Sequence, residues 1–460
     1  MAGRRAAASP RFLIRVPSTT GYLLLVALVA MVVLVVLVTW RKWNPFLALL
    51  AASVVVGLGV EMGAFGALTS FQAGLGDTLG GIAAIIALGA MFGKLLSESG
   101  GAQVLARRFN QFFGPQRALL CISLLATLIG LVTWFAVGLL LLLPIMFTLA
   151  RESRRPVMLL AIPMLTFLSV MHGLTPPHPG PVVAIDALGA DIGMTLLLGF
   201  AVGIPTAFVA GPLFARWIVP RLAEGTGTPV IADETVHRAT PGFGATITVV
   251  VLPIALLLLS TFTGLLLAPG TALYSTLMFV GHPVVALSVA VLLATWVFAR
   301  ACDFDRPQIL AFSEQSVAAI GMVLLVVGGG GGFARVLRDT GIAGAMGEMA
   351  GTMDLSPLVY AWLVAAFIRV ATGSATVAIT TAAGLLAPLV VADPQINREL
   401  LVLSMGFGSL FLSHLNDAGF WLVKEVLGLT VGETFRTWTA LETIIGIAGL
   451  GFTLALGLVI

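Results

Sequence analysis

Long runs without a charged residue dominate the chain. The most prominent are residues 16–40, 118–150, 192–215, 239–299, 370–392 and 443–460. A helix needs about 20 mostly apolar residues to cross the hydrocarbon core of a membrane. These runs are continuous, whereas the strands of a membrane barrel alternate between apolar and polar residues. The pattern therefore predicts an all-α polytopic membrane protein with about 12 transmembrane helices.

The composition supports a chain that lies in a lipid bilayer. Of its 460 residues, 59% are hydrophobic and 10% are charged, against about 25% charged residues in soluble proteins. The 52 glycines and 23 prolines suit helices that pack closely and break at defined places. A net charge of +3 is typical of basic cytoplasmic loops and does not predict a nucleic acid partner. The 2 cysteines form no metal or disulfide pattern, and no cofactor is expected.

Residues 1–42 are predicted to be an N-terminal extension that carries the first transmembrane helix. Basic residues precede the run 16–40, as they do in a signal peptide. The run is too long for a signal peptide, and no small-residue cleavage site ends it. We interpret it as an uncleaved helix whose N-terminus lies in the cytoplasm.

Two segments far apart in the chain resemble each other. GAMFGKLLSESGGA at residues 89–102 matches GGGFARVLRDTGIA at residues 330–343, with glycine, phenylalanine, basic, leucine and acidic positions in the same order. His172 and His414 follow these segments at nearly the same spacing. Such self-similarity predicts a duplicated unit.

The predicted duplication gives a first repeat at residues 43–220, a hydrophilic linker at 221–240 and a second repeat at 241–460. Basic residues are more numerous around the run 118–150 than around the run 370–392. Because Lys and Arg favour the cytoplasmic side of a membrane, this asymmetry predicts that the two repeats have inverted topology. Inverted repeats are typical of secondary transporters.

A re-entrant helical hairpin is predicted in each repeat, near residues 118–150 and near residues 370–390. The first run is too long for one membrane span and too short for two spans with a loop. The tips would be LVTWFAV in the first hairpin and VATGSATVA in the second. Irregular backbone at membrane depth needs protein or water around it. Two facing tips would therefore form a binding site near the middle of the membrane.

Arg369 is a charged residue at the end of an apolar segment, directly before the second predicted tip. Intramembrane charges are expensive and usually functional, and a guanidinium binds a carboxylate through two parallel hydrogen bonds. Thr372, Gly373, Ser374 and Thr376 follow and offer hydroxyl groups and backbone amides to an anionic ligand. All of these residues are predicted to bind substrate. A purely structural role for Arg369 is the alternative.

Further polar residues end two other apolar runs. His414, Asn416 and Asp417 lie in SHLNDAGFW, and His172 lies in MHGLTPPHPGP. Histidine titrates near neutral pH, and a buried aspartate can also carry a proton. We predict that Asp417, His414 and His172 couple transport to protons, and that His172 and Asn416 bind substrate. A helix-end hydrogen bond accounts for His172 equally well, and His178, between prolines, is interpreted as part of a wet loop.

The glycine run at residues 328–332 superficially resembles a phosphate-binding loop. It lacks the lysine and the serine or threonine that complete such a loop. Close helix packing or a helix break is the better interpretation.

Four long motifs of the chain resemble those of the gluconate permease family of bacterial sugar-acid:proton symporters. They are RVATGSATVAITTAAGLLAP, SHLNDAGFWLVKE, HGLTPPHPGP and LGGIAAIIALGAMFGKLLSESGGA. The resemblance covers the chain from about residue 43 onward. It implies import of gluconate or a related sugar acid across the bacterial inner membrane, coupled to protons. It also implies inverted repeats with an elevator-like mechanism, and a homodimer is compatible with such a carrier.

The chain departs from this resemblance at Ala136. Family members carry an acidic residue in the first hairpin tip, in a pattern like FF-acid-VG, whereas this chain reads TWFAVG. The coupling ion and the exact sugar acid therefore stay open.

Other functions are compatible with parts of this pattern. A sodium-coupled or uncoupled carboxylate carrier would share the architecture, with sodium bound by backbone carbonyls at broken helices. A channel is a further alternative, although duplicated hairpins favour a carrier. An intramembrane metal hydrolase would use His172, His178, Asp417 and Glu442. The sequence has neither an HExxH motif nor a serine nucleophile elbow, so neither a metal site nor an enzyme is predicted.

Overall fold

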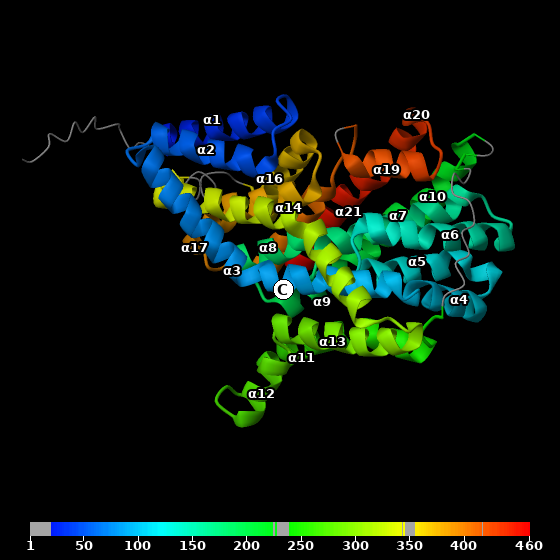
Figure 1. The fold of residues 1–460 in the computed structure, drawn as a ribbon. Helices are drawn as coiled ribbons and strands as arrows, with labels where there is room; N and C mark the ends of the chain where they lie inside the picture. Colours follow the sequence, from blue (N-terminus) through cyan, green and yellow to red (C-terminus); the bar gives the residue numbers. More distant parts are fainter. Residues whose placement is uncertain (1–19, 224–225, 228–238, 343, 346–354, 416) are drawn as a thin grey trace, which may run out of the picture.

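The structure is a computed structural model that describes residues 20–460 apart from 224–225, 228–238, 343, 346–354 and 416. Within these residues the chain is helical and contains no strand (Figure 1), which confirms the predicted all-α class. Residues 1–19 of the predicted extension and most of the predicted linker at 221–240 lie outside the described part.

The helices of the first half run from α1 to α10. They are α1 (Thr20–Thr39), α2 (Pro45–Gly59), α3 (Gly63–Glu98), α4 (Gly101–Phe113), α5 (Ala118–Gly130), α6 (Phe135–Ser153), α7 (Val157–Leu174), α8 (Pro179–Leu188), α9 (Ile192–Phe208) and α10 (Phe214–Ile218). A π-helical turn, η2 (Val209–Leu213), joins α9 to α10.

The helices of the second half run from α11 to α21. They are α11 (Phe243–Leu266), α12 (Ala272–Val280), α13 (Pro283–Cys302), α14 (Arg306–Asp339), α16 (Pro357–Thr372), α17 (Ala375–Ala392), α18 (Arg398–Leu410), α19 (Ala418–Val426), α20 (Val431–Thr434) and α21 (Ala440–Gly457). A second π-helical turn, η4 (Phe435–Thr439), joins α20 to α21.

Helix length separates membrane-crossing helices from shorter ones. In the part of the chain that the structure describes, 9 helices are long and apolar enough to cross a membrane, or 10 if the bent pair α4–α5 counts as one span. The sequence predicts about 12, because it does not separate full spans from shorter apolar helices. Some apolar segments form short helices instead, such as α2 with 15 residues and α16 with 16 residues.

The two longest helices, α3 and α14, pack closely against each other through the glycine run. A Cβ added to Gly328 would contact Leu75 and Leu79, whereas one added to Gly332 would contact Phe71. The contacts move backward along α3 as they move forward along α14, so the two helices are antiparallel. The interpretation of the glycine run as a helix-packing surface is confirmed, and no phosphate loop is present there.

The α3–α14 pair also supports both predicted hairpins. On α3, a Cβ added to Gly93 would lie 2.9 Å from the Val132 carbonyl oxygen, between α5 and α6. On α17, a Cβ added to Gly384 would lie 2.9 Å from the Ala334 Cβ of α14. One hairpin therefore contacts the C-terminal half of α3, and the other contacts the C-terminal half of α14.

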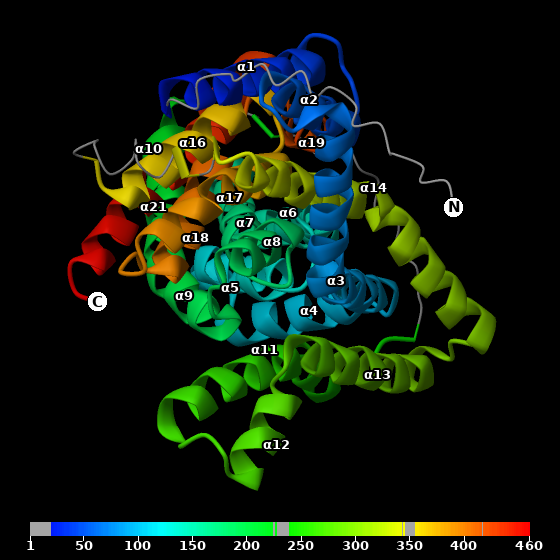
Figure 2. The ribbon, with the colours of Figure 1, turned by 90° about the vertical axis from the view of Figure 1, so that its left-hand side faces the viewer.

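Helices α11, α12 and α13 lie apart from this centre. Figure 2 shows α11 and α13 as a layer beneath the other helices, with α12 pointing away from them. α13 contacts α3, and α11 contacts α4 and α9. No residue of α12 is buried, so α12 contributes nothing to the interior.

Replacing Gly331 with Ala is expected to destabilise the protein by about 1–3 kcal/mol, the usual penalty of overpacking. The new methyl group would lie 1.9 Å from the Thr78 hydroxyl oxygen, so α3 and α14 would have to separate. Gly321→Ala is the matched control on α14, because nothing lies within 4 Å of its added Cβ. Thermal unfolding in detergent compares the two variants, and equal midpoints would contradict the close contact.

Candidate functional site

Four interruptions of the helical backbone define the centre of the molecule. They lie at residues 131–134 between α5 and α6, 175–178 between α7 and α8, 373–374 between α16 and α17, and 411–415 and 417 between α18 and α19. The first and third fall within the predicted hairpin tips. The other two fall within the histidine-containing segments that the sequence analysis singled out.

Hydrogen bonds and packing bring these interruptions together. His178 Nε2 lies 2.6 Å from the Gly130 carbonyl oxygen, which joins the second interruption to the first. His414 Nε2 lies 3.2 Å from the Val370 carbonyl oxygen, which joins the fourth to the third. Helices α8 and α17 pack against each other, so the two pairs share one region.

Arg369 is the buried cation of this region, with 3% of its side chain exposed. It lies in the last turn of α16 and donates a hydrogen bond from Nη2 to Asp417 Oδ2. Asp417 also accepts hydrogen bonds from the Ser413 hydroxyl and, at 2.8 Å, from the Gly419 amide at the start of α19. The guanidinium is therefore held in place by a carboxylate that is itself fixed by its own helix.

The π-helical turn η4 holds the other side of this pair. Trp438 Nε1 donates to the Ser413 hydroxyl at 2.7 Å, and the Thr439 hydroxyl donates to the Ser413 carbonyl oxygen at 2.6 Å. The Trp438 ring lies 5.1 Å from the Phe135 ring at the start of α6. π-Helical turns occur frequently at functional sites, and this one connects the fourth interruption to the first hairpin.

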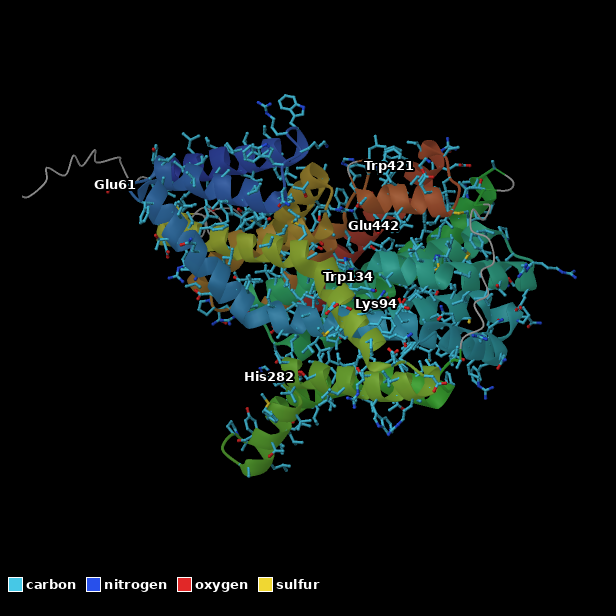
Figure 3. All side chains as sticks on the ribbon, in the orientation of Figure 1. Glu61, Lys94, Trp134, His282, Trp421 and Glu442 are labelled. Carbon is cyan, nitrogen blue, oxygen red and sulfur yellow. The ribbon has the colours of Figure 1, made fainter. Side chains whose placement is uncertain are left out.

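Several buried polar atoms in this centre have no hydrogen-bond partner among the described residues. They are Arg369 Nε, His172 Nδ1 and both carboxylate oxygens of Glu442. Glu442 is 1% exposed, lies inside the helix bundle (Figure 3), and is within electrostatic reach of Arg369 and Asp417. Buried polar groups without partners are costly and rare, so their concentration here indicates a site that takes a polar ligand or a proton.

The two histidines of the first half line the same centre. The His172 and His178 rings lie 4.8 Å apart, and His172 is within electrostatic reach of Arg369. His178 is 2% exposed, so its interpretation as part of a wet loop is wrong. The proline-flanked segment is covered by the hairpins packed around it, which sequence alone does not reveal.

The start of α17 presents hydroxyl and amide groups next to Arg369. Gly373 adopts a left-handed conformation with φ 73°, which ends α16 and turns the chain sharply. The Ser374 hydroxyl then caps α17 by accepting a hydrogen bond from the Val377 amide at 3.3 Å. The N-terminus of a helix favours negative charge, so this turn suits an anion bound beside the guanidinium.

Most predicted site residues lie around this centre. They are Arg369, Thr372, Gly373, Ser374, Thr376, His172, His414 and Asp417. Asn416 lies outside the described residues. Ala136 lies in the first turn of α6 and is exposed.

Glu442 and Ser413 were missed as members of the site. Glu442 borders the uncharged run 443–460, and an acid at that position is itself a signal, because intramembrane carboxylates are usually functional. Ser413 carried no comparable signal, since its role depends on contacts with η4. Among the described residues, no group of three or more His, Cys, Asp or Glu residues could hold a metal ion.

Comparison with known proteins gives extensive similarity to transport proteins. A family model described as GntP family permease matches residues 22–459. The gluconate permease of Pseudomonas aeruginosa is 45% identical over 447 residues, covering 96% of this chain and 99% of that protein. The Gnt-II system L-idonate transporter of Escherichia coli is 40% identical over 423 residues, covering 91% and 95% respectively. Permeases are not enzymes, so the prediction of a non-enzyme is confirmed.

A solved structure shares the fold. The crystal structure of the Alcanivorax borkumensis YdaH transporter matches with a TM-score of 0.66 and 16% sequence identity, covering 94% of this chain and 98% of that chain. At this identity the similarity concerns the fold alone.

Arg369 and Asp417 are expected to show strong energetic coupling. Asp417→Asn removes the carboxylate partner of a buried guanidinium, and Arg369→Gln removes the cation beside Asp417, so each single change should lower the unfolding temperature. The double variant should lose less stability than the sum, with a coupling of at least about 1 kcal/mol. Thermal unfolding of the four proteins measures this coupling.

The matched control is the exposed pair formed by Lys424 and Glu425, whose atoms lie 2.7 Å apart with Glu425 70% exposed. Exposed pairs contribute about 0–1 kcal/mol. Coupling of Arg369 to Asp417 no larger than in this control would contradict the buried ion pair.

Proposed function

The chain belongs to the GntP family of permeases, and from this premise we propose that it is a secondary active transporter that imports gluconate or a related sugar acid. The observation that carries the proposal is the buried guanidinium of Arg369, whose Nε has no hydrogen-bond partner among the described residues. It lies where broken helices of both halves of the chain meet.

The substrate class follows from the chemistry of this centre and from the relatives. Gluconate and L-idonate, the substrates named for two relatives, are both hydroxylated carboxylates. A guanidinium binds a carboxylate strongly and with defined geometry. Arg369 would therefore bind the carboxylate group of the substrate.

The hydroxyl groups of the substrate would be bound by the start of α17 and by the C-terminal end of α7, where His172 lies. Thr372, Ser374 and Thr376 contribute hydroxyl groups there, and Gly373 turns the chain between α16 and α17. His172 has an unpartnered Nδ1, which suits a substrate hydroxyl. We also assign Asn416 to this set, on its position in the sequence between His414 and Asp417.

Proton symport is the proposed coupling. His172, His414 and Asp417 are ionisable residues within the centre, and an inward proton gradient is the usual driving force of carriers with such residues. Sodium coupling or uncoupled transport is the alternative. Sodium would bind the backbone carbonyl oxygens exposed at the helix interruptions.

Alternating access by an elevator-like movement is proposed from the order of elements. A long helix is followed by a hairpin and a broken helix in each half: α3, α5–α6 and α7–α8, then α14, α16–α17 and α18–α19. This order supports the predicted inverted repeats, 43–220 and 241–460. We place the carrier in the bacterial inner membrane, where a homodimer is compatible with the proposal.

Uptake of labelled gluconate by proteoliposomes tests this function. Accumulation driven by an inward proton gradient and abolished by a protonophore would support proton symport. Accumulation that requires a sodium gradient would support the alternative, and exchange without accumulation would indicate an uncoupled carrier. Absence of gluconate uptake and exchange under every gradient would contradict the proposed substrate.

The double variant Arg369→Gln/Asp417→Asn is expected to abolish gluconate binding while it remains folded. It removes both charges together, so no unpaired buried charge is left to unfold the protein. Loss of a charge-assisted bidentate contact should weaken binding at least about 100-fold.

Titration calorimetry measures this affinity, with the exposed double variant Lys424→Gln/Glu425→Gln as the control. Affinity within about threefold of the control, less than 1 kcal/mol, would remove Arg369 from the binding site.

A further inference from the structure

The proposed function assigns no role to Glu442, yet it is the most deeply buried carboxylate of the centre. It lies in the first turn of α21 with 1% of its surface exposed, and the Ser169 hydroxyl of α7 is the neutral donor that faces its carboxylate. An ionised carboxylate that is buried without a cation in direct contact is among the most expensive groups to bury. The neutral acid avoids this penalty, so this position suits a carboxyl group that gains and loses a proton.

The charged groups that face Glu442 come from two of its neighbouring elements. Arg369 on α16 and Asp417 before α19 are both within electrostatic reach. On α7, the Ser169 hydroxyl faces the carboxylate, and His172 lies further along the same helix, near Arg369.

The remaining elements packed against α21 place no buried charge beside Glu442. Helix α9 and the turn η2 contain no titratable residue, and Arg436 of η4 is exposed. The charged residues of α18, Arg398 and Glu399, lie in its first turn and bind the Gly189 carbonyl oxygen and the Asp191 amide. The charge balance around Glu442 is therefore set by Arg369 and Asp417.

We propose that Glu442 binds the proton that is transported with the sugar acid, and that Asp417 serves as the counter-ion of Arg369. This inference rests on the proposed function and names its coupling residue. It replaces the role in proton coupling that the sequence analysis gave to Asp417, because Asp417 is occupied by Arg369, Ser413 and the Gly419 amide.

Coulomb repulsion provides the coupling. When Glu442 is ionised, the centre holds one cation and two carboxylates, and a third carboxylate is repelled across a medium of low dielectric constant. When Glu442 takes a proton from the outer solution, one negative charge is removed and the substrate carboxylate can pair with Arg369 Nε. On the cytoplasmic side Glu442 releases that proton to water, and the restored repulsion expels the sugar acid.

The experiment is a measurement of proton uptake when gluconate binds to the purified full-length protein in weak buffer. We expect about one proton per gluconate, and a Kd that rises about tenfold per pH unit above the pH at which Glu442 ionises. Glu442→Gln, which resembles the protonated acid, should take up no proton and bind gluconate with a Kd independent of pH. Its gradient-driven accumulation should fall at least tenfold.

The matched control is Glu425→Gln, the same chemical change at a carboxylate that is 70% exposed. It should retain the proton uptake of the unaltered protein. Proton uptake of about one per gluconate in Glu442→Gln would overturn the assignment and leave the proposed function intact. Absence of gluconate binding by the unaltered protein would overturn both.

A second variant keeps the assignment testable if Glu442→Gln does not fold. Glu442→Asp retains an acid that is one methylene shorter and so sits in a different environment. A shift in the pH at which gluconate binding is half lost would support the assignment. An unchanged pH profile would overturn it.

Discussion

A guanidinium buried among apolar helices must be paired, and the pair formed by Arg369 and Asp417 is the interaction on which the centre of the molecule depends. Asp417 reaches Arg369 only because the chain leaves the helical conformation between α18 and α19. That non-helical segment is in turn held by Trp438 and Thr439 through Ser413. A single ion pair therefore fixes the relative positions of α16, α19 and the π-helical turn η4.

Broken helices inside a membrane protein also need a packed surrounding, because unpaired backbone groups are costly in lipid. The close contact of α3 with α14 provides it, since the glycines of α14 leave room for the side chains and backbone of α3 to approach closely. Thr175, Pro176 and His178 are buried, which shows how fully the interruption at 175–178 is enclosed. The polar centre is thus a small region inside a dense apolar frame.

Local features of the sequence predicted the helical class and the places where helices break. The first interruption lies in the middle of a run too long for one span, and the second lies at TGS, where Gly373 takes the left-handed conformation that ends α16. The number of spans is less well defined by the sequence, since hydropathy does not distinguish a full span from a short or broken helix. The burial of His178 and the partners of Asp417 depend on packing between distant segments, which periodicity along the chain does not encode. In the sequence, Glu442 is recognisable only as an acidic residue beside a long uncharged run. Its connection to Arg369 becomes visible only in the folded chain.

The assignment of the proton to Glu442 has a consequence for the energy of moving the centre across the membrane. The loaded centre holds Arg369, ionised Asp417, neutral Glu442 and one substrate carboxylate, for a net charge of −1. The empty centre with ionised Glu442 also has a net charge of −1. Because moving a charge through the membrane potential carries an energy of about 2.3 kcal/mol per 100 mV, equal charges make the loaded and empty movements equally sensitive to voltage. On this assignment the cycle carries no net charge, so the pH difference and the substrate gradient drive accumulation.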